Sequence, residues 1–335
     1  MNFFRRKLLL GAGAAALTAW TVAPAIASDW PNRPIRMIVP GAPGSGTDNF
    51  ARLLADPLSR ALDQTIIVDN KPGANGIIAS DAVAKSVPDG YSILFTNASS
   101  IVVNEALGQA LPYKPEELRP VSQVSSGGVL LVAASRLGLR TLDDVVQYIK
   151  AHPDQSYASW GVGSTGHIMM EWIASQTSID VQHVPYKSIP QILTDLKGGV
   201  IDFAFVDARH AAIPMVKEGS LNPIGVSGTK RSPAFPDTPT LTEQGLPMEA
   251  DGWYGVFVPA GVQDSIVSRL NQTITAILTN RDMQDILRAQ HIASPPIKSP
   301  EEFARSVDQD IEIWSNAVKK SRSWRKLENL VQGSG

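Results

Sequence analysis

The sequence contains no cysteine among its 335 residues, and this absence excludes several kinds of chemistry. There is no disulfide framework, no thiolate nucleophile and no cysteine-ligated zinc site. Histidine is also scarce, and His152, His183 and His291 lack the close spacing typical of metal ligands. We therefore expect a protein without a metal or another cofactor, whose fold depends on its apolar core.

The sequence also has no excess of basic over acidic residues. The full chain carries a formal net charge of −2, and Arg5, Arg6 and Lys7 contribute +3, so the remainder carries −5. This balance predicts no nucleic-acid partner, because binding of a polyanion depends on clustered lysine and arginine. No stretch after residue 22 is long and apolar enough to span a bilayer, so we expect a soluble mature protein.

The first 27 residues have the composition of an export signal. A basic triplet, Arg5 to Lys7, precedes an apolar segment from Leu8 to about Val22. Ala25-Ile26-Ala27 then forms a small-x-small cleavage pattern before Ser28. The arginine pair leaves both general secretion and twin-arginine export open. The rest of the chain is long enough for two domains of ordinary size.

Apolar runs of strand length alternate with segments of helical periodicity through most of that remainder. This alternation predicts an α/β fold with mostly parallel sheets. The predicted strands are Ile35–Val39, Thr65–Asp69, Ser92–Thr96, Val129–Ala134, Tyr157–Trp160, Val181–Val184, Asp202–Val206, Pro223–Ser227 and Trp253–Pro259. The predicted helices are Asn49–Leu62, Gly76–Lys85, Leu142–His152, Gly166–Thr177, Ile189–Lys197, Ala211–Glu218, Asp264–Ala289 and about Pro300–Lys320.

The first loop, Pro40–Asp48, is rich in glycine and joins a predicted strand to a predicted helix. Free N–H groups of a first helical turn and the helix dipole attract an anion, and Thr47 or Asp48 can cap the turn. The loop has the glycine spacing of a P-loop, but Thr47 replaces the lysine that meets nucleotide phosphates, so a carboxylate is favoured. A loop that only turns the chain is the alternative. The candidate ligand-binding residues here are Ala42, Gly44, Ser45, Gly46, Thr47 and Asp48.

The second loop, Trp160–His167, repeats this pattern in the other half of the chain. Its Gly-x-Gly-x-x-Gly is a weak dinucleotide fingerprint, because Asp180 comes too soon to hold a ribose. Two such loops facing each other would grip a small acid from both sides, and a simple capping turn is the alternative. Residues beyond a strand end are also candidates, because ligands of open α/β sheets lie there. The candidates are Ser164, Thr165, Gly166 and His167 in the loop, and Asn97 and Ser99 after a strand.

Seven short motifs are spread over nearly the whole mature chain: Trp30–Arg36, Gly44–Asp48, Asn70–Gly76, Pro88–Tyr91, Val184–Lys187, Asp195–Asp202 and Pro236–Leu241. Together they resemble the Bug receptors, the substrate-binding proteins of tripartite tricarboxylate transporters. The resemblance implies a two-lobed periplasmic binding protein of the second topological type. It places 28–125 and 254–335 in one lobe and 126–253 in the other, with crossings near Val124–Gly128 and Asp251–Gly255.

The resemblance also implies a function. It implies a monomeric periplasmic receptor that binds a small carboxylate through N–H groups, hydroxyls and waters, and passes it to the large and small membrane subunits of the transporter. Citrate-like acids, C4 dicarboxylates, acidic amino acids and aromatic acids all remain open. Asp207 matches a position that lines the family's site. Ser188 replaces the family's usual glycine. Arg209 or His210 could add a cationic contact, and a solvated helix start, favoured for Arg209, is the alternative.

Two other functions stay open at this point. One is a periplasmic α/β enzyme acting on a small acid, with Ser164 and His167 as the catalytic pair. The sequence around Ser164 lacks the Gly-x-Ser-x-Gly of a nucleophile elbow, so we expect a receptor and not an enzyme. The other is a ligand-sensing subunit of a membrane signalling protein, which would differ from a transport receptor only in its partner.

Overall fold

The computed structural model describes residues 30–207, 212–247, 249, 252–290 and 292–320. Met1–Trp30 and Pro31–Gly335 form separate units, and the architecture below is that of the second. The expected export signal, together with Arg209 and His210, lies outside the described residues. Among the described helices, none combines the length and the apolarity needed to cross a membrane.

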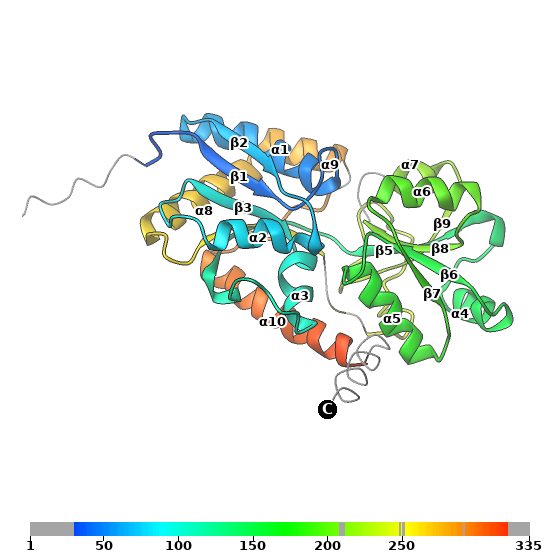
Figure 1. Cartoon of the computed structure of the whole chain (residues 1–335). Helices are drawn as coiled ribbons and strands as arrows, with labels where there is room; N and C mark the ends of the chain where they lie inside the picture. Colours follow the sequence, from blue (N-terminus) through cyan, green and yellow to red (C-terminus); the bar gives the residue numbers. More distant parts are fainter. Residues whose placement is uncertain (1–29, 208–211, 248, 250–251, 291, 321–335) are drawn as a thin grey trace, which may run out of the picture. The chain divides into compact units, whose positions relative to one another are not determined.

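The first sheet has the strand order β2-β1-β3-β10-β4. Strand β10 runs antiparallel to both of its neighbours, β3 and β4, while β1 runs parallel to β2 and β3. Four of these strands come from the first part of the chain and one returns from much later, and Figure 1 shows β1, β2 and β3 in blue and cyan. The strands are β1 Ile35–Val39, β2 Ile66–Asn70, β3 Ser92–Asn97, β4 Leu118–Ser126 and β10 Trp253–Pro259.

The second sheet repeats this order as β7-β6-β8-β5-β9. Here β5 is the antiparallel strand, inserted between β8 and β9. Each sheet therefore receives one strand directly after a crossing of the chain, which is the second topological type of binding-protein fold. We call each sheet with its helices a lobe, and the predicted two-lobed α/β class is confirmed. The strands are β5 Val129–Ala134, β6 Ser156–Ser159, β7 Gln182–Pro185, β8 Phe203–Asp207 and β9 Leu221–Val226.

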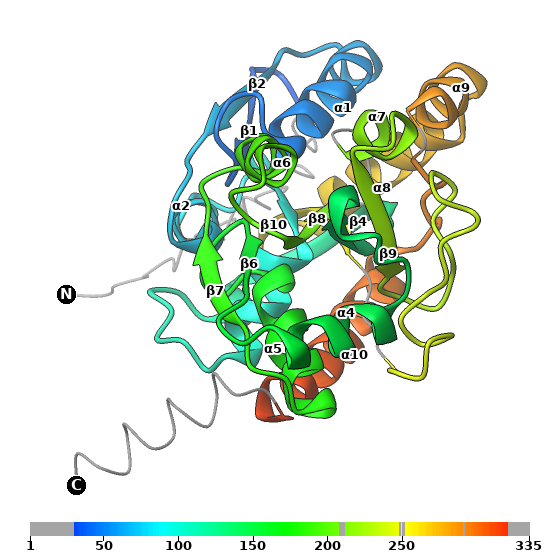
Figure 2. The same ribbon diagram turned by 90° about the vertical axis from the view of Figure 1, so that its right-hand side faces the viewer.

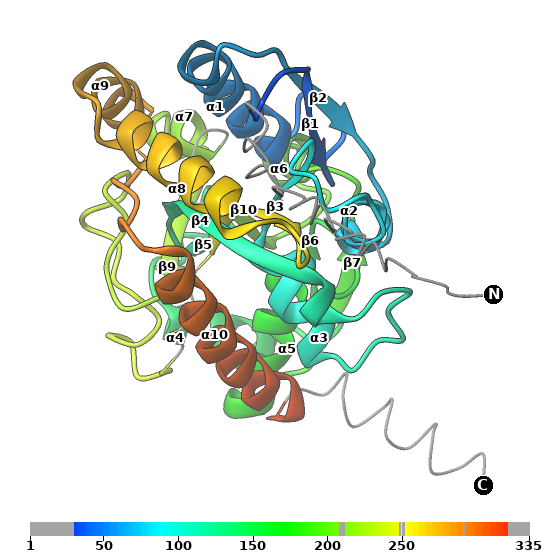
Figure 3. The same ribbon diagram turned by 90° about the vertical axis from the view of Figure 1, so that its left-hand side faces the viewer.

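Helices cover both faces of each sheet because consecutive crossovers run in opposite directions. The chain steps from β1 outward to β2 and then back past β1 to β3, so right-handed connections place α1 and α2 on opposite faces. Helices α1 and α8 lie side by side (Figure 3), and in the second lobe α6 and α5 take opposite faces (Figure 1). The helices are α1 Gly46–Leu62, α2 Ile77–Ala84, α3 Asn104–Ala106, α4 Leu142–Ala151, α5 Thr165–Thr177, α6 Ile189–Gly198, α7 Ala212–Lys217, α8 Asp264–Thr279, α9 Arg281–Ala289 and α10 Pro300–Lys320.

The nine predicted strands are confirmed to within two residues, but β4 was not predicted. Its sequence contains Pro120, and proline is tolerated in a sheet only at an edge or a bulge. Strand β4 is an edge strand, and its register with β10 shifts beside that proline. The single helix predicted over Asp264–Ala289 is wrong, because Asn280 adopts an extended backbone and caps a new helix, α9.

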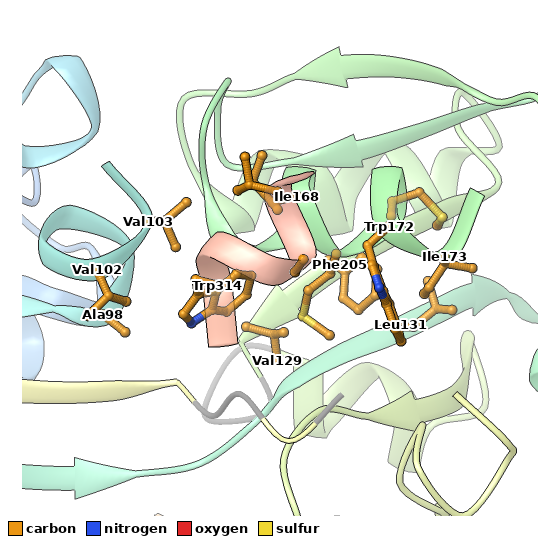
Figure 4. Packing of buried hydrophobic residues seen from close by; sticks show 14 of the residues in the cluster. Ala98, Val102, Val103, Val129, Leu131, Ile168, Trp172, Ile173, Phe205 and Trp314 are labelled. Carbon is orange, nitrogen blue, oxygen red and sulfur yellow. The ribbon is translucent and has the colours of Figure 1, made fainter. Parts of the chain in front are cut away.

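A shared apolar core continues from one lobe into the other. Trp314 of α10 is 1 % exposed and belongs to the same cluster as Val103 of the first lobe and Phe205 of the second, and Figure 4 shows it among them. Helix α10 also contacts α5, as the side-on view indicates (Figure 2). Gly127 lies between β4 and β5, which belong to different sheets, and its N–H donates to the carbonyl of Gly252, just before β10, at 2.9 Å. The predicted lobe boundaries, 28–125 with 254–335 and 126–253, remain a prediction.

Candidate functional site

The first loop is closed by a serine cap. Ser45 has an extended backbone, and its Oγ accepts from the N–H of Asp48 at 3.3 Å. The expectation that Thr47 or Asp48 caps the helix is therefore wrong, because α1 begins at Gly46, three residues earlier than predicted. Gly44 has φ +80°, a left-handed conformation that glycine adopts without steric cost and that turns the loop into the helix.

The buried side chain of Asp48 stabilises this loop through hydrogen bonds. Its carboxylate is 2 % exposed and accepts from the N–H of Gly44 at 2.9 Å, from Asn70 Nδ2 at 2.9 Å and from Arg52 at 3.0–3.1 Å. Burial opposes ionisation, but the hydrogen bonds from Arg52, Gly44 and Asn70 outweigh it and lower the pKa of the Asp48 carboxyl. Arg52 balances the negative charge, so Asp48 does not repel an anion at the loop.

The second loop has the same geometry built from different residues. Ser164 caps α5, and its Oγ accepts from the N–H of His167 at 3.3 Å. Gly163 has φ +76°, and its N–H donates to His167 Nδ1 at 3.1 Å. His167 therefore has the same role as Asp48 in the first loop, because it accepts a hydrogen bond from the loop glycine. It does so with a neutral ring nitrogen in place of a charged carboxylate oxygen. His167 Nδ1 is therefore an acceptor within the loop.

Buried imidazoles surround the base of the second loop. The rings of His167 and His183 stack with centroids 4.1 Å apart, and His183 Nε2 lies 2.8 Å from Ser159 Oγ, which in turn lies 3.0 Å from Ser164 Oγ. Burial lowers the pKa of His167, and burial beside His167 lowers the pKa of His183 to about 3. Ser164 is fully buried and meets His167 only through its backbone N–H, so these two residues do not form a nucleophile and base.

Each loop leaves first-turn N–H groups unused. In the described part of the chain, the N–H groups of Gly46, Thr47 and Gly166 have no hydrogen-bond partner. These three donors lie at the positive ends of the α1 and α5 dipoles, the arrangement that binds anions. Gly166 must lack a side chain, because a Cβ there would lie 2.8 Å from Phe205 Cβ and 2.9 Å from the Trp160 ring.

Two strand-end residues approach the loop of the opposite lobe. The hydroxyl of Ser99, just beyond β3, accepts from the N–H of Thr165 at 3.1 Å. Asp207, at the end of β8, accepts from the hydroxyl of Tyr254 at 3.3 Å, and a Cβ on Gly46 would lie 4.0 Å from its Oδ2. The fold therefore gathers both loops, Ser99 and Asp207 into one region.

The remaining candidates have less direct positions. Asn97 is part-buried, and its Oδ1 accepts from the N–H of Ser100 at 3.0 Å, within the short helical segment η2 (Ser99–Val103). Ala42 is exposed in the first loop, while the side chains of Thr47 and Thr165 are buried. Contact of any of these residues with a ligand stays a prediction.

Several residues of this region were not predicted. Tyr254 carries the hydroxyl that meets Asp207 and packs against Phe50 and Phe95, with ring centroids 5.4 and 5.7 Å away. Asn70 and Asn75 both lie in the stretch Asn70–Gly76, which the sequence marked only by its resemblance to a family. Their partners are distant in the chain, so no local pattern could have revealed their roles.

Two hollows lie outside this region. One of about 210 Å³ is lined by apolar side chains such as Phe257 and Ile311, with Glu105 and Asp308 among its polar residues. The other, of about 700 Å³, lies in the second lobe beside His183 and Glu171, and of the two loops it reaches only His167. The described residues contain no cluster of histidine and acidic side chains suited to a metal ion.

The repeated sheet order and the paired glycine-rich loops are those of a two-lobed solute-binding protein. A family profile described as the tripartite tricarboxylate transporter family receptor matches residues 50–322, and the chain belongs to this family. The expectation of a receptor and not an enzyme is therefore confirmed, and the alternative of a catalytic pair formed by Ser164 and His167 is set aside.

Relatives and solved structures agree with this assignment. Protein BugT of Bordetella pertussis is 34% identical over 319 residues, spanning 94% of this chain and 97% of that protein. The structure of Rpa4515 from Rhodopseudomonas palustris with adipate has a TM-score of 0.80 at 30% identity, covering 87% and 98% of the two chains. MatC from the same organism, with bound malate, has a TM-score of 0.78 at 28% identity, covering 86% and 99%. The periplasmic binding protein BugD is similarly alike, with a TM-score of 0.77.

Proposed function

We propose that this chain is a periplasmic receptor that binds a small dicarboxylate or tricarboxylate between its two loops and delivers it to the membrane subunits of a tripartite transporter. One observation carries the proposal. Two helices in different lobes each open with a serine-capped glycine loop and leave N–H groups at Gly46, Thr47 and Gly166 for a ligand. Acidic amino acids and aromatic acids are the next classes to test.

The absence of cationic side chains from both loops indicates how the ligand is held. Neither Pro40–Asp48 nor Trp160–His167 contains lysine or arginine. Backbone N–H groups and the helix dipole must then balance the ligand charge, with the Thr47 and Thr165 hydroxyls as further donors. A carboxylate at each helix start matches two separate donor sets better than one highly charged phosphate does. The similar MatC and Rpa4515 structures, which hold malate and adipate, support a dicarboxylate.

Calorimetry on the mature chain tests this proposal. We expect C4 to C6 diacids or citrate to bind without being consumed, and the matching methyl esters to bind at least about tenfold more weakly, because each ester removes a charge-assisted acceptor. Thr47→Val and Thr165→Val should each weaken binding about fivefold by removing a hydroxyl donor. Thr273→Val is the matched control, because that hydroxyl is exposed on α8 and bonds only within its helix. Equal affinity for acid and ester would contradict the proposal.

Delivery to a transporter is the second part of the proposal. Export by residues 1–27 would place the mature receptor, as a monomer of lobes 28–125 with 254–335 and 126–253, beside the large and small membrane subunits. A strain lacking this gene should lose uptake of the labelled acid and regain it with the wild-type gene. Normal uptake combined with a lost transcriptional response to the acid would instead identify a sensing subunit.

A further inference from the structure

The side chain of Asn75 reaches from the first lobe to the second loop. Asn75 lies in the short helical segment η1 (Ala74–Gly76), between β2 and α2, and Gly163 lies 88 positions further along the chain. Its Nδ2 donates to the carbonyl of Gly163 at 3.0 Å. The same nitrogen lies 2.9 Å from Asn104 Oδ1 and 3.2 Å from the carbonyl of Ser99. This contact therefore joins the two lobes through a single amide.

A second path runs parallel to the first. Asn75 Oδ1 accepts from the hydroxyl of Ser99 at 3.3 Å, and Ser99 Oγ accepts from the N–H of Thr165 at 3.1 Å. The direction of every bond is fixed, because the amide oxygen must face the hydroxyl and the amide nitrogen must face the carbonyls. Asn75 and Ser99 are thus hydrogen-bonded to the second loop at two points, the Gly163 carbonyl and the Thr165 N–H. We call Asn75, Ser99, Gly163 and Thr165 together the interlobe bridge.

The backbone of Asn75 is held in an unfavourable conformation. Its φ of +47° lies in the left-handed region, which asparagine tolerates better than most residues but at a cost in free energy. Asn104 is fully buried and supports this conformation by donating to the carbonyl of Asn75 at 3.1 Å and to that of Ser100 at 3.0 Å. Several hydrogen bonds thus hold a strained residue at a contact between the lobes. Such strain is typical of residues with a functional role, beyond local stability.

We infer that Asn75 is a positioning residue that sets the affinity of the receptor for all its ligands together. The inference rests on the proposed carboxylate site, and the side-chain amide of Asn75 is already bonded to Gly163, Asn104 and Ser99. The interlobe bridge favours the arrangement in which Gly166 of the second loop faces the first loop. Apparent affinity scales with the fraction of protein in that arrangement. Loss of the bridge therefore weakens every ligand by the same factor, whereas loss of a ligand contact weakens ligands unequally.

Asn75→Asp is the sharpest variant for a test. It keeps an acceptor for Ser99 and nearly the same shape, but it removes the donor to Gly163 and turns an oxygen toward that carbonyl. Asn271→Asp is the matched control, because Asn271 Nδ2 also donates to two backbone carbonyls, of Val121 at 2.8 Å and Lys298 at 3.0 Å, both within the first lobe. Both variants should lose thermal stability, so stability alone does not decide the inference.

Affinity is the first readout. Asn75→Asp should bind malate and adipate, two dianions that meet the charge of the new carboxylate equally, with affinities lowered by a common factor of at least about ten, the loss expected when one buried acceptor is left unpaired. Asn271→Asp should keep wild-type affinity for each acid. Unchanged affinity in Asn75→Asp, or a loss that differs several-fold between acids, would overturn the inference.

A distance between the lobes is the second readout and needs no ligand. The chain has no cysteine, so Val87→Cys and Val200→Cys, at exposed positions in different lobes, give a clean pair for spin labels. In ligand-free protein, Asn75→Asp should shift the distance distribution away from that of the wild type, and Asn271→Asp should not. An unshifted distribution would overturn the inference. If wild-type protein bound no carboxylate while the shift occurred, the bridge would stand and the proposed function would fail.

Discussion

At the scale of single residues, the two loops perform one task with different chemistry. Asp48 and His167 both accept from the glycine N–H four residues earlier and so fix the same turn, one as a charged group and one as a neutral ring. The sequence revealed both loops through their glycines and the helices that follow. It did not reveal that Ser45 and Ser164 are the caps, because the capping position depends on the residue at which each helix begins.

The buried imidazole pair makes stability depend on pH. Burial holds the pKa of His183 at about 3, below the value near 6.5 of an unfolded chain, so the unfolded state binds more protons between these values. The free energy of unfolding should therefore fall as pH drops below about 6.5, by about 1.4 kcal/mol per pH unit from this histidine. Urea unfolding at pH 8, 6 and 5 measures the slope.

The variant His183→Gln isolates this contribution. It keeps a hydrogen-bonding group near Ser159 but cannot be protonated, so its stability should decline less steeply than that of the wild type below pH 6.5. The two proteins should differ by a constant amount above pH 7. Parallel declines at all pH values would show that His183 does not cause the slope.

At the scale of elements, the contact between β10 and α10 carries a buried carboxyl group. Asp310 of α10 accepts from Trp253 Nε1 at 2.7 Å, directly beyond the second crossing. Burial raises the pKa of the Asp310 carboxyl to about 6, although the Trp253 hydrogen bond and nearby Lys298 oppose the shift. The folded state therefore holds a proton that the unfolded state has already released between about pH 4 and pH 6, and stability is lost as pH rises through this window.

Replacement of Asp310 by asparagine should relieve this cost. Asp310→Asn keeps an oxygen acceptor for Trp253 and removes the buried charge, so we expect it to stabilise the protein by about 1–3 kcal/mol at pH 8 and not at pH 4. Denaturant unfolding at both pH values is the measurement, with exposed Glu312→Gln on the same helix as the charge control. Destabilisation at pH 8 would mean that the pairing of Asp310 with Lys298 outweighs its burial.

Elements were predicted best where one periodicity dominates. Strands β1, β5 and β10 and helix α10 match their predicted bounds because their apolar residues follow a single pattern. Strand β4 escaped prediction because Pro120 reads as a strand breaker unless the strand is known to lie at an edge. The break between α8 and α9 rests on one residue, Asn280, whose capping role depends on the tertiary fold.

At the scale of the whole molecule, the fold follows from the alternation of elements, but the site depends on contacts between lobes. Ser99 could be predicted as a strand-end residue, because ligands of α/β sheets lie beyond the strand ends. Asp207 could be predicted only from the resemblance to the receptor family. The pairing of Ser99 with Thr165 and of Asp207 with Tyr254 could not be predicted, since these partners are 66 and 47 positions apart. The identity of the ligand depends on the shape of the space between the loops and on bound water, which neither propensity nor periodicity encodes.

The most direct test of the proposed carboxylate site follows individual backbone amides during a titration with a carboxylate. In amide proton–nitrogen spectra of deuterated protein, malate or adipate should shift the signals of Gly46, Thr47 and Gly166 downfield, because each N–H gains an anionic acceptor. The signals of Gly44 and Gly163 should move less, since their N–H groups are already bonded to Asp48 and His167. Shifts confined to residues around the hollow beside His183, with Gly46, Thr47 and Gly166 unmoved, would contradict the proposed site.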